Sequence, residues 1–162
     1  MQHRFSRTEL LIGPAALASL KAKKVAVFGL GGVGSYTAEA LARSGVGKLV
    51  LIDYDIICLT NINRQVHALE TTVDQPKVTA MAERLRLINP QIELVLHQEF
   101  FSAANRESIL TPDLDYVVDA IDTVSSKVEL IAYAKTAGIP IIASMGTGNK
   151  LDPLQFKITD IS

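Results

Sequence analysis

The stretch that decides the fold is "VAVFGLGGVGS" (Val25–Ser35), which is followed by "LVLIDYD" (Leu49–Asp55). A short apolar run enters a glycine-rich turn of the form G-x-G-x-x-G, made by Gly29, Gly31 and Gly34, with Gly32 as a fourth glycine. Glycines let the chain turn sharply and let backbone N–H groups approach a phosphate with no Cβ in the way. The helix predicted next points its positive end at the same place, so the pattern favours a bound anion.

An acidic residue follows at the expected distance. Asp53 ends the second apolar run, 19 positions after Gly34, where a carboxylate can accept hydrogen bonds from ribose hydroxyls. We assign Asp55 to the same site. A tight turn alone would also explain the glycines, but strand, turn, helix and acid in register predict a nucleotide site. The pattern does not identify the nucleotide, because NAD, FAD, S-adenosylmethionine and ATP all present a ribose and a phosphate or a polar equivalent.

Short apolar runs alternate with amphipathic segments along the whole chain. Five runs have the composition of buried strands: 24–29, 48–53, 92–97, 116–121 and 139–144. Helices are predicted between them, over 33–44, 77–88, 102–110 and 125–137. This alternation predicts an α/β fold with a Rossmann-like, doubly wound and mostly parallel sheet. An N-terminal helical extension over 8–20 and a trailing strand over 154–161 complete the prediction.

Composition narrows the class of protein. The 162 residues suit a single domain, and a net charge of −1 argues against a basic surface over the whole chain for nucleic acid. The single cysteine, Cys58, excludes an internal disulfide framework and a CxxC zinc site, and we expect it to be a packed residue in a cytoplasmic protein. We expect no signal peptide and no membrane span. Because the chain stops at Ser162 directly after a strand-like run, we expect a C-terminal portion to be missing.

One connection is unusually long. The 23 residues of 54–76 separate the second strand from its helix, whereas such connections usually take about 2–6 residues. The segment contains Arg64 and keeps Ile, Leu and Val throughout, so we do not interpret it as a disordered linker. Lys77 opens the next helix directly after Pro76, where its ammonium and the helix dipole can act on one anion.

Carboxylates follow the fourth strand in "VVDAIDTV". Ligands bind outside the carboxyl ends of strands in an open α/β sheet, so Asp119 and Asp122 are candidates for holding Mg²⁺. Taken singly, Arg64 could be a solvated loop residue, Lys77 an exposed helix lysine and Asp122 only a helix N-cap. Together they indicate charge stabilisation during cleavage of a triphosphate.

These motifs also carry a resemblance. The pattern "GLGGVGS…LARSGVGKLVLIDYD…TNINRQ…PK…INP…DAID" resembles the ubiquitin-activating-enzyme-like superfamily, which includes the bacterial adenylyltransferases of molybdopterin and thiamin biosynthesis. The segments "CLTNINRQVHAL" (58–69), "YVVDAID" (116–122) and "GTGNKLDP" (146–153) resemble one branch, the tRNA threonylcarbamoyladenosine dehydratases of the TcdA or CsdL type. The resemblance implies that 1–162 is an ATP-binding adenylyltransferase domain. It also implies ATP-dependent dehydration, by cyclisation, of threonylcarbamoyladenosine in tRNA through adenylation of a carboxylate.

The resemblance implies roles for individual residues. It assigns the triphosphate to Gly29, Gly31, Gly32 and Gly34, and the ATP ribose to Asp53. The family pattern Asn-x-x-Arg-Gln falls on Asn61, Arg64 and Gln65. Arg64 and Lys77 are expected on the phosphates, and Asp122 is expected to organise Mg²⁺. Arg7 matches an arginine that the partner subunit supplies, so a homodimer is implied.

Partners and alternatives stay open at this point. The resemblance implies tRNA binding through regions mostly absent from this chain, and sulfur-transfer proteins as further partners. A first alternative is an adenylyltransferase acting on the C-terminal Gly-Gly of a ubiquitin-like sulfur carrier. A second is an NAD-dependent oxidoreductase, which shares the glycine turn but leaves Arg64, Lys77 and the long connection unexplained. A third is a nucleotide-binding scaffold or sensor without turnover.

Overall fold

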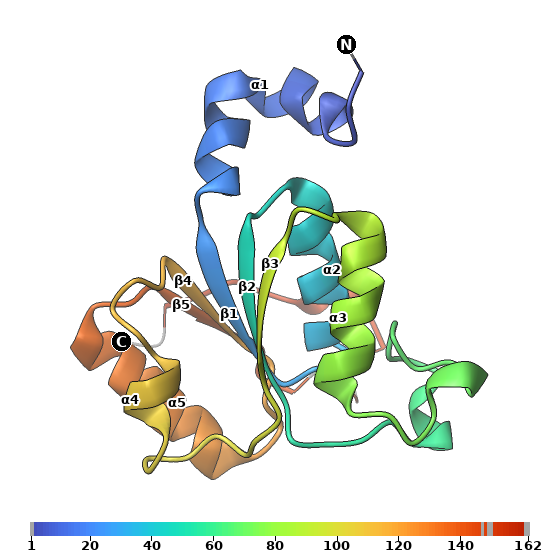
Figure 1. Ribbon diagram of the computed structural model, residues 1–162. Coiled ribbons are helices and arrows are strands. Elements are labelled where there is room, and N and C mark those ends of the chain that lie inside the picture. Colours follow the sequence, from blue (N-terminus) through green and yellow to red (C-terminus); the bar gives the residue numbers. More distant parts are fainter. Residues whose placement is uncertain (1, 147, 149–150, 161–162) are drawn as a thin grey trace.

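A five-stranded parallel sheet forms the centre of the computed structural model, which describes residues 2–146, 148 and 151–160 (Figure 1). The strand order is β3-β2-β1-β4-β5, and every neighbouring pair is parallel. The strands are β1 (Lys24–Phe28), β2 (Lys48–Ile52), β3 (Glu93–His97), β4 (Tyr116–Asp119) and β5 (Ile141–Ala143). All five predicted strands are therefore confirmed, with ends shifted by no more than two residues.

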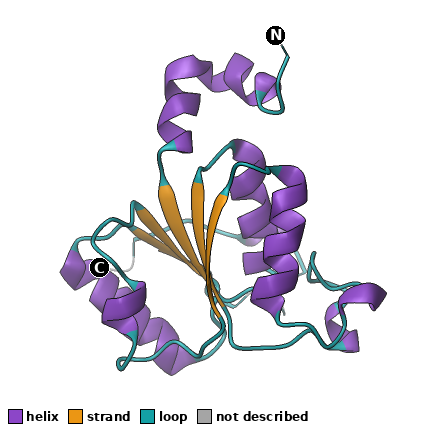
Figure 2. Ribbon diagram, viewed as in Figure 1, coloured by secondary structure: helices purple, strands orange, loops and turns teal. Residues whose placement is uncertain are grey.

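Helices cover both faces of the sheet (Figure 2). On one face lie α2 (Gly34–Ser44) and α3 (Lys77–Ile88), and on the other lie α4 (Arg106–Ile109) and α5 (Val124–Ala137). Two separate apolar clusters result, because successive residues of a strand point to opposite faces. One joins Val27 and Leu51 to Met81, and the other joins Phe28 to Leu130. The predicted doubly wound arrangement is confirmed.

Two sequence-based expectations need correction within this sheet. The run 92–97 was expected to be buried, but β3 is an edge strand, and Val95 and Leu96 are partly exposed. The helix expected over 102–110 shortens to α4. Residues 102–105 instead form a turn, in which the Ser102 N–H donates to Asn105 Oδ1 at 2.9 Å. A short polar side chain that bonds its own backbone competes with helix formation in this way.

The N-terminal helical extension is confirmed as α1 (Ser6–Lys21), which leads into β1 at the amino end of the sheet. It is kinked at Gly13, whose φ of 81° and ψ of 161° are not helical, and Pro14 follows with no N–H to donate. Among the described residues, none of the helices is both long and apolar enough to cross a membrane.

The predicted trailing strand is wrong over the described part of 154–161. A short 3₁₀ turn, η3 (Pro153–Gln155), is followed by irregular chain through residue 160. Leu154 and Ile158 are 91% and 94% exposed. An alternating pattern becomes a strand only where its backbone pairs with a sheet edge, and in the described chain residues 154–160 do not pair with the open edge of β5. Residue 161 lies outside the described residues, as do positions 147, 149 and 150 of the "GTGNKLDP" motif.

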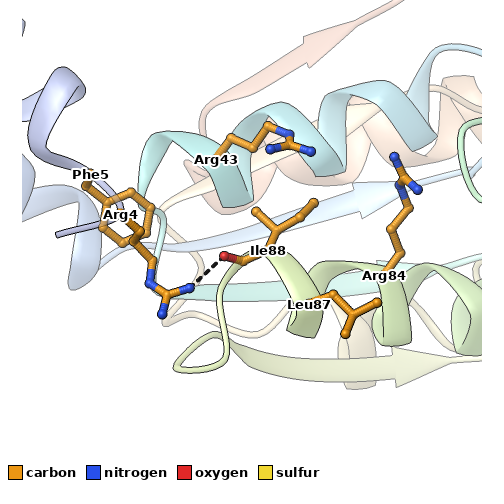
Figure 3. A pocket seen from close by; sticks show the side chains of 6 residues that line it. All are labelled: Arg4, Phe5, Arg43, Arg84, Leu87 and Ile88. Atoms are coloured by element: carbon orange, nitrogen blue, oxygen red, sulfur yellow. Dashed lines mark hydrogen bonds between the residues drawn. The ribbon is translucent and has the colours of Figure 1, made fainter.

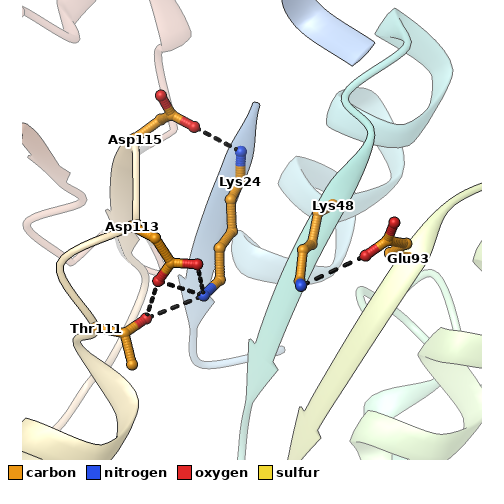
Figure 4. Close-up of polar contacts among 6 residues, drawn as sticks. All are labelled: Lys24, Lys48, Glu93, Thr111, Asp113 and Asp115. Atoms are coloured by element: carbon orange, nitrogen blue, oxygen red, sulfur yellow. Dashed lines mark hydrogen bonds and ion pairs between the residues drawn. The ribbon is translucent and has the colours of Figure 1, made fainter. Parts of the chain in front are cut away.

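Ion pairs tie the strands together at their amino end (Figure 4). The Lys24 ammonium lies 2.8 Å from both carboxylate oxygens of Asp113 and donates to the Thr111 hydroxyl at 3.0 Å. Across the next strand pair, Lys48 Nζ lies 3.4 Å from Glu93 Oε2. These lysines and carboxylates at the amino end of the sheet therefore pair with one another.

A cavity of about 440 Å³ lies beside α1 at this same end (Figure 3). Three arginines line it, and each already has a protein partner. Arg4 Nη1 donates to the Ile88 carbonyl oxygen at 2.8 Å, while Arg43 and Arg84 both bind the carboxylate of Glu39. Arg84 thereby connects α3 to α2, Arg43 pairs within α2, and Arg4 holds the end of α3.

Candidate nucleotide site

A larger pocket, of about 1290 Å³, opens at the carboxyl ends of the strands. Its lining includes the glycine turn after β1, the end of β2, the long connection 54–76 and the β4–α5 turn. Parallel strands deliver all of these segments to one edge, since every strand runs in the same direction. The pocket therefore collects most of the predicted site residues.

The four glycines of the turn have different roles. A Cβ on Gly34 would lie 1.8 Å from the Gly29 carbonyl oxygen, and one on Gly29, whose φ is +82°, would lie 2.7 Å from the Ala120 carbonyl oxygen. These two positions are closed by the protein itself. A Cβ on Gly31 would meet nothing within 4 Å, and one on Gly32 would touch the Arg64 stem at 3.4 Å. Gly31 thus faces open space where a ligand can approach the backbone.

The Asp53 carboxylate is hydrogen-bonded to the backbone of the glycine turn. Its Oδ2 accepts the Leu30 N–H at 2.6 Å, and its Oδ1 accepts the Asp55 N–H at 2.8 Å. Burial raises the pKa of this carboxyl, although both N–H groups favour its charged form. Each oxygen retains a lone pair, and the residue lines the pocket, so its geometry is compatible with a ribose hydroxyl.

The connection 54–76 is ordered, as the sequence analysis expected. Ile57 and Ala68 pack against Ala80 in a small cluster of their own. The Val66 N–H donates to Ser35 Oγ at 3.2 Å, which attaches the connection to the start of α2. The segment therefore behaves as a fixed wall of the pocket.

The Asn-x-x-Arg-Gln residues all line the pocket. Asn61 Oδ1 accepts the Cys58 N–H at 3.0 Å, so this residue shapes the loop. The Arg64 guanidinium is exposed and donates to the Thr60 carbonyl oxygen at 2.9 Å. Gln65 is buried, and its Oε1 has no hydrogen-bond partner among the described residues. A buried acceptor left unsatisfied at a pocket wall is suited to a ligand donor.

Lys77 places a buried cation at the start of α3. Its side chain is 7% exposed, and its Nζ lies 2.6 Å from Asp55 Oδ2. The side chain of Asp55 is 41% exposed, so it can turn toward solvent if an anion takes its place. The fully buried His67 lies close to this cation, and burial first, then the charges of Lys77 and Arg84, lower the pKa of its imidazole to about 4.

The two carboxylates at the carboxyl end of β4, Asp119 and Asp122, differ in exposure. Asp122 is exposed and lines the pocket, and its charge adds to that of Asp55 in raising the pKa of Tyr54. Asp119 is fully buried and accepts from Lys127 Nζ at 2.7 Å and from the Ile121 N–H at 3.0 Å. Both oxygens of Asp119 are thus bonded within the fold, so the prediction that Asp119 holds Mg²⁺ is wrong.

Two predicted residues do not line the pocket. Arg7 is exposed on α1, at the opposite end of the sheet from the pocket, so its own chain does not bring it to the glycine turn. Cys58 was expected to be packed, but it is exposed at the start of a 3₁₀ turn, η1 (Leu59–Asn61).

Tyr54, Phe100 and Lys127 are among the pocket-lining residues that were not predicted from the sequence. Tyr54 and Phe100 form an edge-to-face pair with ring centroids 5.3 Å apart, and Lys127 lines the pocket while pairing with Asp119. A signal for Lys127 was present. A cation in the first turn of a helix opposes the helix dipole, so a lysine placed there calls for a nearby carboxylate.

Known proteins resemble this chain along its length. Residues 5–158 match the sequence profile of the ThiF family. The tRNA threonylcarbamoyladenosine dehydratase of Bacillus subtilis is 50% identical over 162 residues, which are 100% of this chain and 64% of that relative. The crystal structure of the E. coli tRNA N6-threonylcarbamoyladenosine dehydratase, TcdA, in complex with ATP superposes with a TM-score of 0.95 at 43% identity, over 97% of this chain and 65% of that one.

A more distant relative is the molybdopterin-synthase adenylyltransferase of E. coli, which is 34% identical over 125 residues, 77% of this chain and 50% of that protein. This chain spans less than two thirds of the length of the dehydratases that it matches.

Proposed function

The chain belongs to the ThiF family, and on this premise we propose that it performs the ATP-dependent cyclisation of threonylcarbamoyladenosine in tRNA, through adenylation of the substrate carboxylate. The resemblance to dehydratases over the whole chain supports this choice of substrate. The observation that carries the proposal is the convergence of Arg64 and Lys77 on a pocket beside an open glycine turn. Such an arrangement suits charge that develops on phosphate oxygens.

The proposed chemistry has two steps. The substrate carboxylate attacks the α-phosphorus of ATP, a new P–O bond forms, and pyrophosphate leaves with the electron pair of the broken bond. In the acyl-adenylate, AMP replaces oxide as the leaving group. A nucleophile within the same modified base then attacks the acyl carbon, the ring closes and AMP departs, so the base has lost one water. This second attack is intramolecular and benefits from a high effective molarity, so no enzyme thiol is required.

We assign the protein's part to binding and neutralisation of charge. The backbone at Gly31 approaches the phosphates, with Gly29, Gly32 and Gly34 shaping the turn. The guanidinium of Arg64 and the ammonium of Lys77 neutralise phosphate oxygens, with Lys77 leaving Asp55 to do so. Asp53 accepts from the ribose. Asn61 fixes the loop, and Gln65 offers its free acceptor to the nucleotide.

Mg²⁺ is proposed at Asp122. Among the described residues no group of three or more His, Cys, Asp and Glu side chains could hold a metal. Mg²⁺ in nucleotide sites uses one or two carboxylates together with phosphate oxygens and water, so a single exposed carboxylate at the pocket fits its requirements. When bound, the ion supplies neutralisation of the triphosphate charge.

We further propose that the active unit is a homodimer in the cytoplasm. The exposed position of Arg7, far from the pocket of its own chain, supports delivery of this side chain to the pocket of a second copy. Contacts with tRNA are assigned to regions outside this chain, and sulfur-transfer proteins are proposed as partners on the resemblance alone.

The decisive experiment incubates full-length protein with ATP, Mg²⁺ and tRNA that carries the open-chain modification, followed by mass spectrometry of the nucleosides. We expect an ATP-dependent loss of one water from the modified base. The matched control is Lys77→Met, which removes the ammonium and keeps the length of the side chain. An unchanged nucleoside mass with folded wild-type protein that binds ATP would contradict the proposal. Normal turnover in Lys77→Met would also contradict it.

A second candidate is adenylation of the C-terminal Gly-Gly carboxylate of a ubiquitin-like sulfur carrier, which the likeness to a molybdopterin-synthase adenylyltransferase supports. The two differ in the acceptor that drives pyrophosphate release, so the assay is repeated with tRNA and with carrier protein. Calorimetry with NAD against ATP tests the oxidoreductase alternative, and tight ATP binding without pyrophosphate exchange would indicate a sensor.

A further inference from the structure

Two lysine–carboxylate pairs flank the glycine turn, and they differ in one respect. Lys77 and Asp55 lie after β2, with an N···O distance of 2.6 Å. Lys127 lies in the first turn of α5 and pairs at 2.7 Å with Asp119, the last residue of β4. Both lysines line the pocket. The side chain of Asp55 is 41% exposed, whereas that of Asp119 is 0% exposed.

This difference in exposure decides what each lysine can do. If Lys77 moves to an anion, water can solvate the Asp55 carboxylate, so breaking this ion pair costs little free energy. If Lys127 moved away, Asp119 would be left as an uncompensated buried carboxylate, which is strongly unfavourable. Lys127 is therefore a fixed cation that stays on Asp119, and it does not serve as a mobile ligand for phosphate.

The Lys127–Asp119 pair organises the β4–α5 turn, residues 120–123. The second oxygen of Asp119 accepts the Ile121 N–H at 3.0 Å. The Ala120 N–H donates to the Phe28 carbonyl oxygen at 2.8 Å, which attaches the turn to the last residue of β1. One carboxylate thus connects the first turn of α5 to the backbone that leads into Asp122.

The turn rests directly on the glycine turn. A Cβ on Gly29 would lie 2.7 Å from the Ala120 carbonyl oxygen, and one on Gly34 would lie 3.2 Å from the Ala120 Cβ. With so little space between the two turns, a displacement of one is felt by the other. The position of Asp122 relative to the glycine turn therefore depends on what holds residues 120 and 121.

We propose that Lys127 is a positioning residue, which acts through Asp119 to hold the β4–α5 turn so that the Asp122 carboxylate faces the glycine turn. The proposal rests on the proposed function only in giving Asp122 a role at Mg²⁺. Lys127 itself touches neither nucleotide nor metal. Its effect is on the placement of a carboxylate that does.

Amide hydrogen exchange tests the mechanical part without any nucleotide. In Lys127→Met we expect the Ile121 amide, held by Asp119, to exchange at least about tenfold faster. The Lys24 amide at the amino end of the sheet, held by Asp115 Oδ2 at 2.8 Å, is the matched control and should not change. Equal acceleration of both amides would mean a general loss of stability and would overturn the proposal, as would unchanged exchange at Ile121.

Calorimetry tests the functional part, with ATP affinity measured with Mg²⁺ and with a chelator. We expect Lys127→Met to lose most of the gain in affinity that Mg²⁺ gives, with little change in the affinity for metal-free ATP. Lys127→Arg should restore the gain, since it keeps the charge. In an Asp122→Asn background Lys127→Met should add nothing, because both changes act on one group.

Each outcome has a distinct meaning. Wild-type protein that fails to bind ATP contradicts the proposed function, and the exchange measurement then decides the positioning role alone. Wild-type protein with a normal Mg²⁺ effect, matched by Lys127→Met, overturns the inference and leaves the function intact. If Lys127→Met does not fold, the Asp119→Leu/Lys127→Met double variant removes both charges and the acceptor for the Ile121 N–H, and it enters the same measurements with the same expectations.

Discussion

The two ends of the parallel sheet contain the same kinds of residue and use them differently. At the amino end, Lys24 and Lys48 pair with carboxylates that belong to the strands and loops around them. At the carboxyl end, Lys77 pairs with a half-exposed carboxylate, and Gln65 leaves a buried acceptor unsatisfied in the described chain. The paired charges at the amino end of the sheet stabilise the fold. The exchangeable ion pair and the unsatisfied acceptor at the carboxyl end are suited to binding a ligand.

The largest expected effect comes from the glycine turn. Gly34→Ala should lower the free energy of unfolding by more than about 3 kcal/mol or prevent folding, because the new Cβ would lie 1.8 Å from the Gly29 carbonyl oxygen. Gly31→Ala is the matched control, since its Cβ meets nothing within 4 Å. It should fold normally and weaken ATP binding. Urea unfolding and ATP titration separate the two, and equal stability of both variants would contradict the assignment.

Substituting one lysine at each end of the sheet tests the difference between the two ends directly. Lys77→Met should reduce ATP-dependent pyrophosphate release by at least about 10²-fold, since one cation is removed from a site of developing charge. Lys24→Met removes a cation from the amino end and should leave turnover within about twofold, because that charge serves only the fold. Initial rates at saturating ATP provide the measurement. A comparable loss in both variants would erase the distinction between the ends.

Arg7 is the one amino-end residue to which we assign a role in catalysis, and it would act in a second copy. Arg7→Ala alone should lower turnover at least about tenfold. Mixing Arg7→Ala with Lys77→Met subunits should restore about a quarter of the wild-type rate, because half the dimers are then mixed and each contains one intact pocket. Rates after subunit exchange test this. If the mixture stays inactive although mixed dimers form, Arg7 does not act in trans.

Acid should affect the two ends in different pH ranges. The imidazole of His67 has a pKa of about 4, below its usual 6.5, so the folded protein binds fewer protons than the unfolded chain between these values. Stability is therefore lost as the pH falls from about 6.5 to 4, by about 2–3 kcal/mol. The hydrogen bond from Lys24 lowers the pKa of Asp113 to about 2, so the contribution of that ion pair is lost only from about pH 4 downward.

Unfolding free energies of wild-type protein and His67→Leu at pH 7 and pH 4.5 provide the test. The variant should lack the loss seen in the wild type over this interval, since no other group differs between them. Parallel pH dependence would show that His67 does not remain neutral in the folded protein.

Local sequence was sufficient for the elements of this fold. The helix 77–88 was predicted at its observed bounds, because Pro76 and a regular apolar spacing define it locally. The glycine turn was likewise predicted from its local pattern, G-x-G-x-x-G. The predicted trailing strand failed because an alternating pattern does not determine whether a segment pairs with a sheet edge. The exposure of β3 was missed because edge positions depend on strand order.

Arg64, Lys77 and Asp122 were predicted from the sequence, and the three residues line one pocket. Their roles toward a nucleotide stay predictions. Asp119 was misjudged. In the sequence it is an acid three residues before Asp122 with equal claim to a metal, and only its pairing with Lys127 shows that it belongs to the fold.

The sequence by itself determined the strand–turn–helix alternation and the glycine turn, because periodicity and the lack of a Cβ are properties of local chain. The tertiary structure alone decided which charges are free. Whether a carboxylate is exposed like that of Asp55 or enclosed like that of Asp119 depends on the segments that pack around it. Burial determines the cost of leaving a charge without a partner, and so it separates the lysine that can bind a ligand from the lysine that must stay in place.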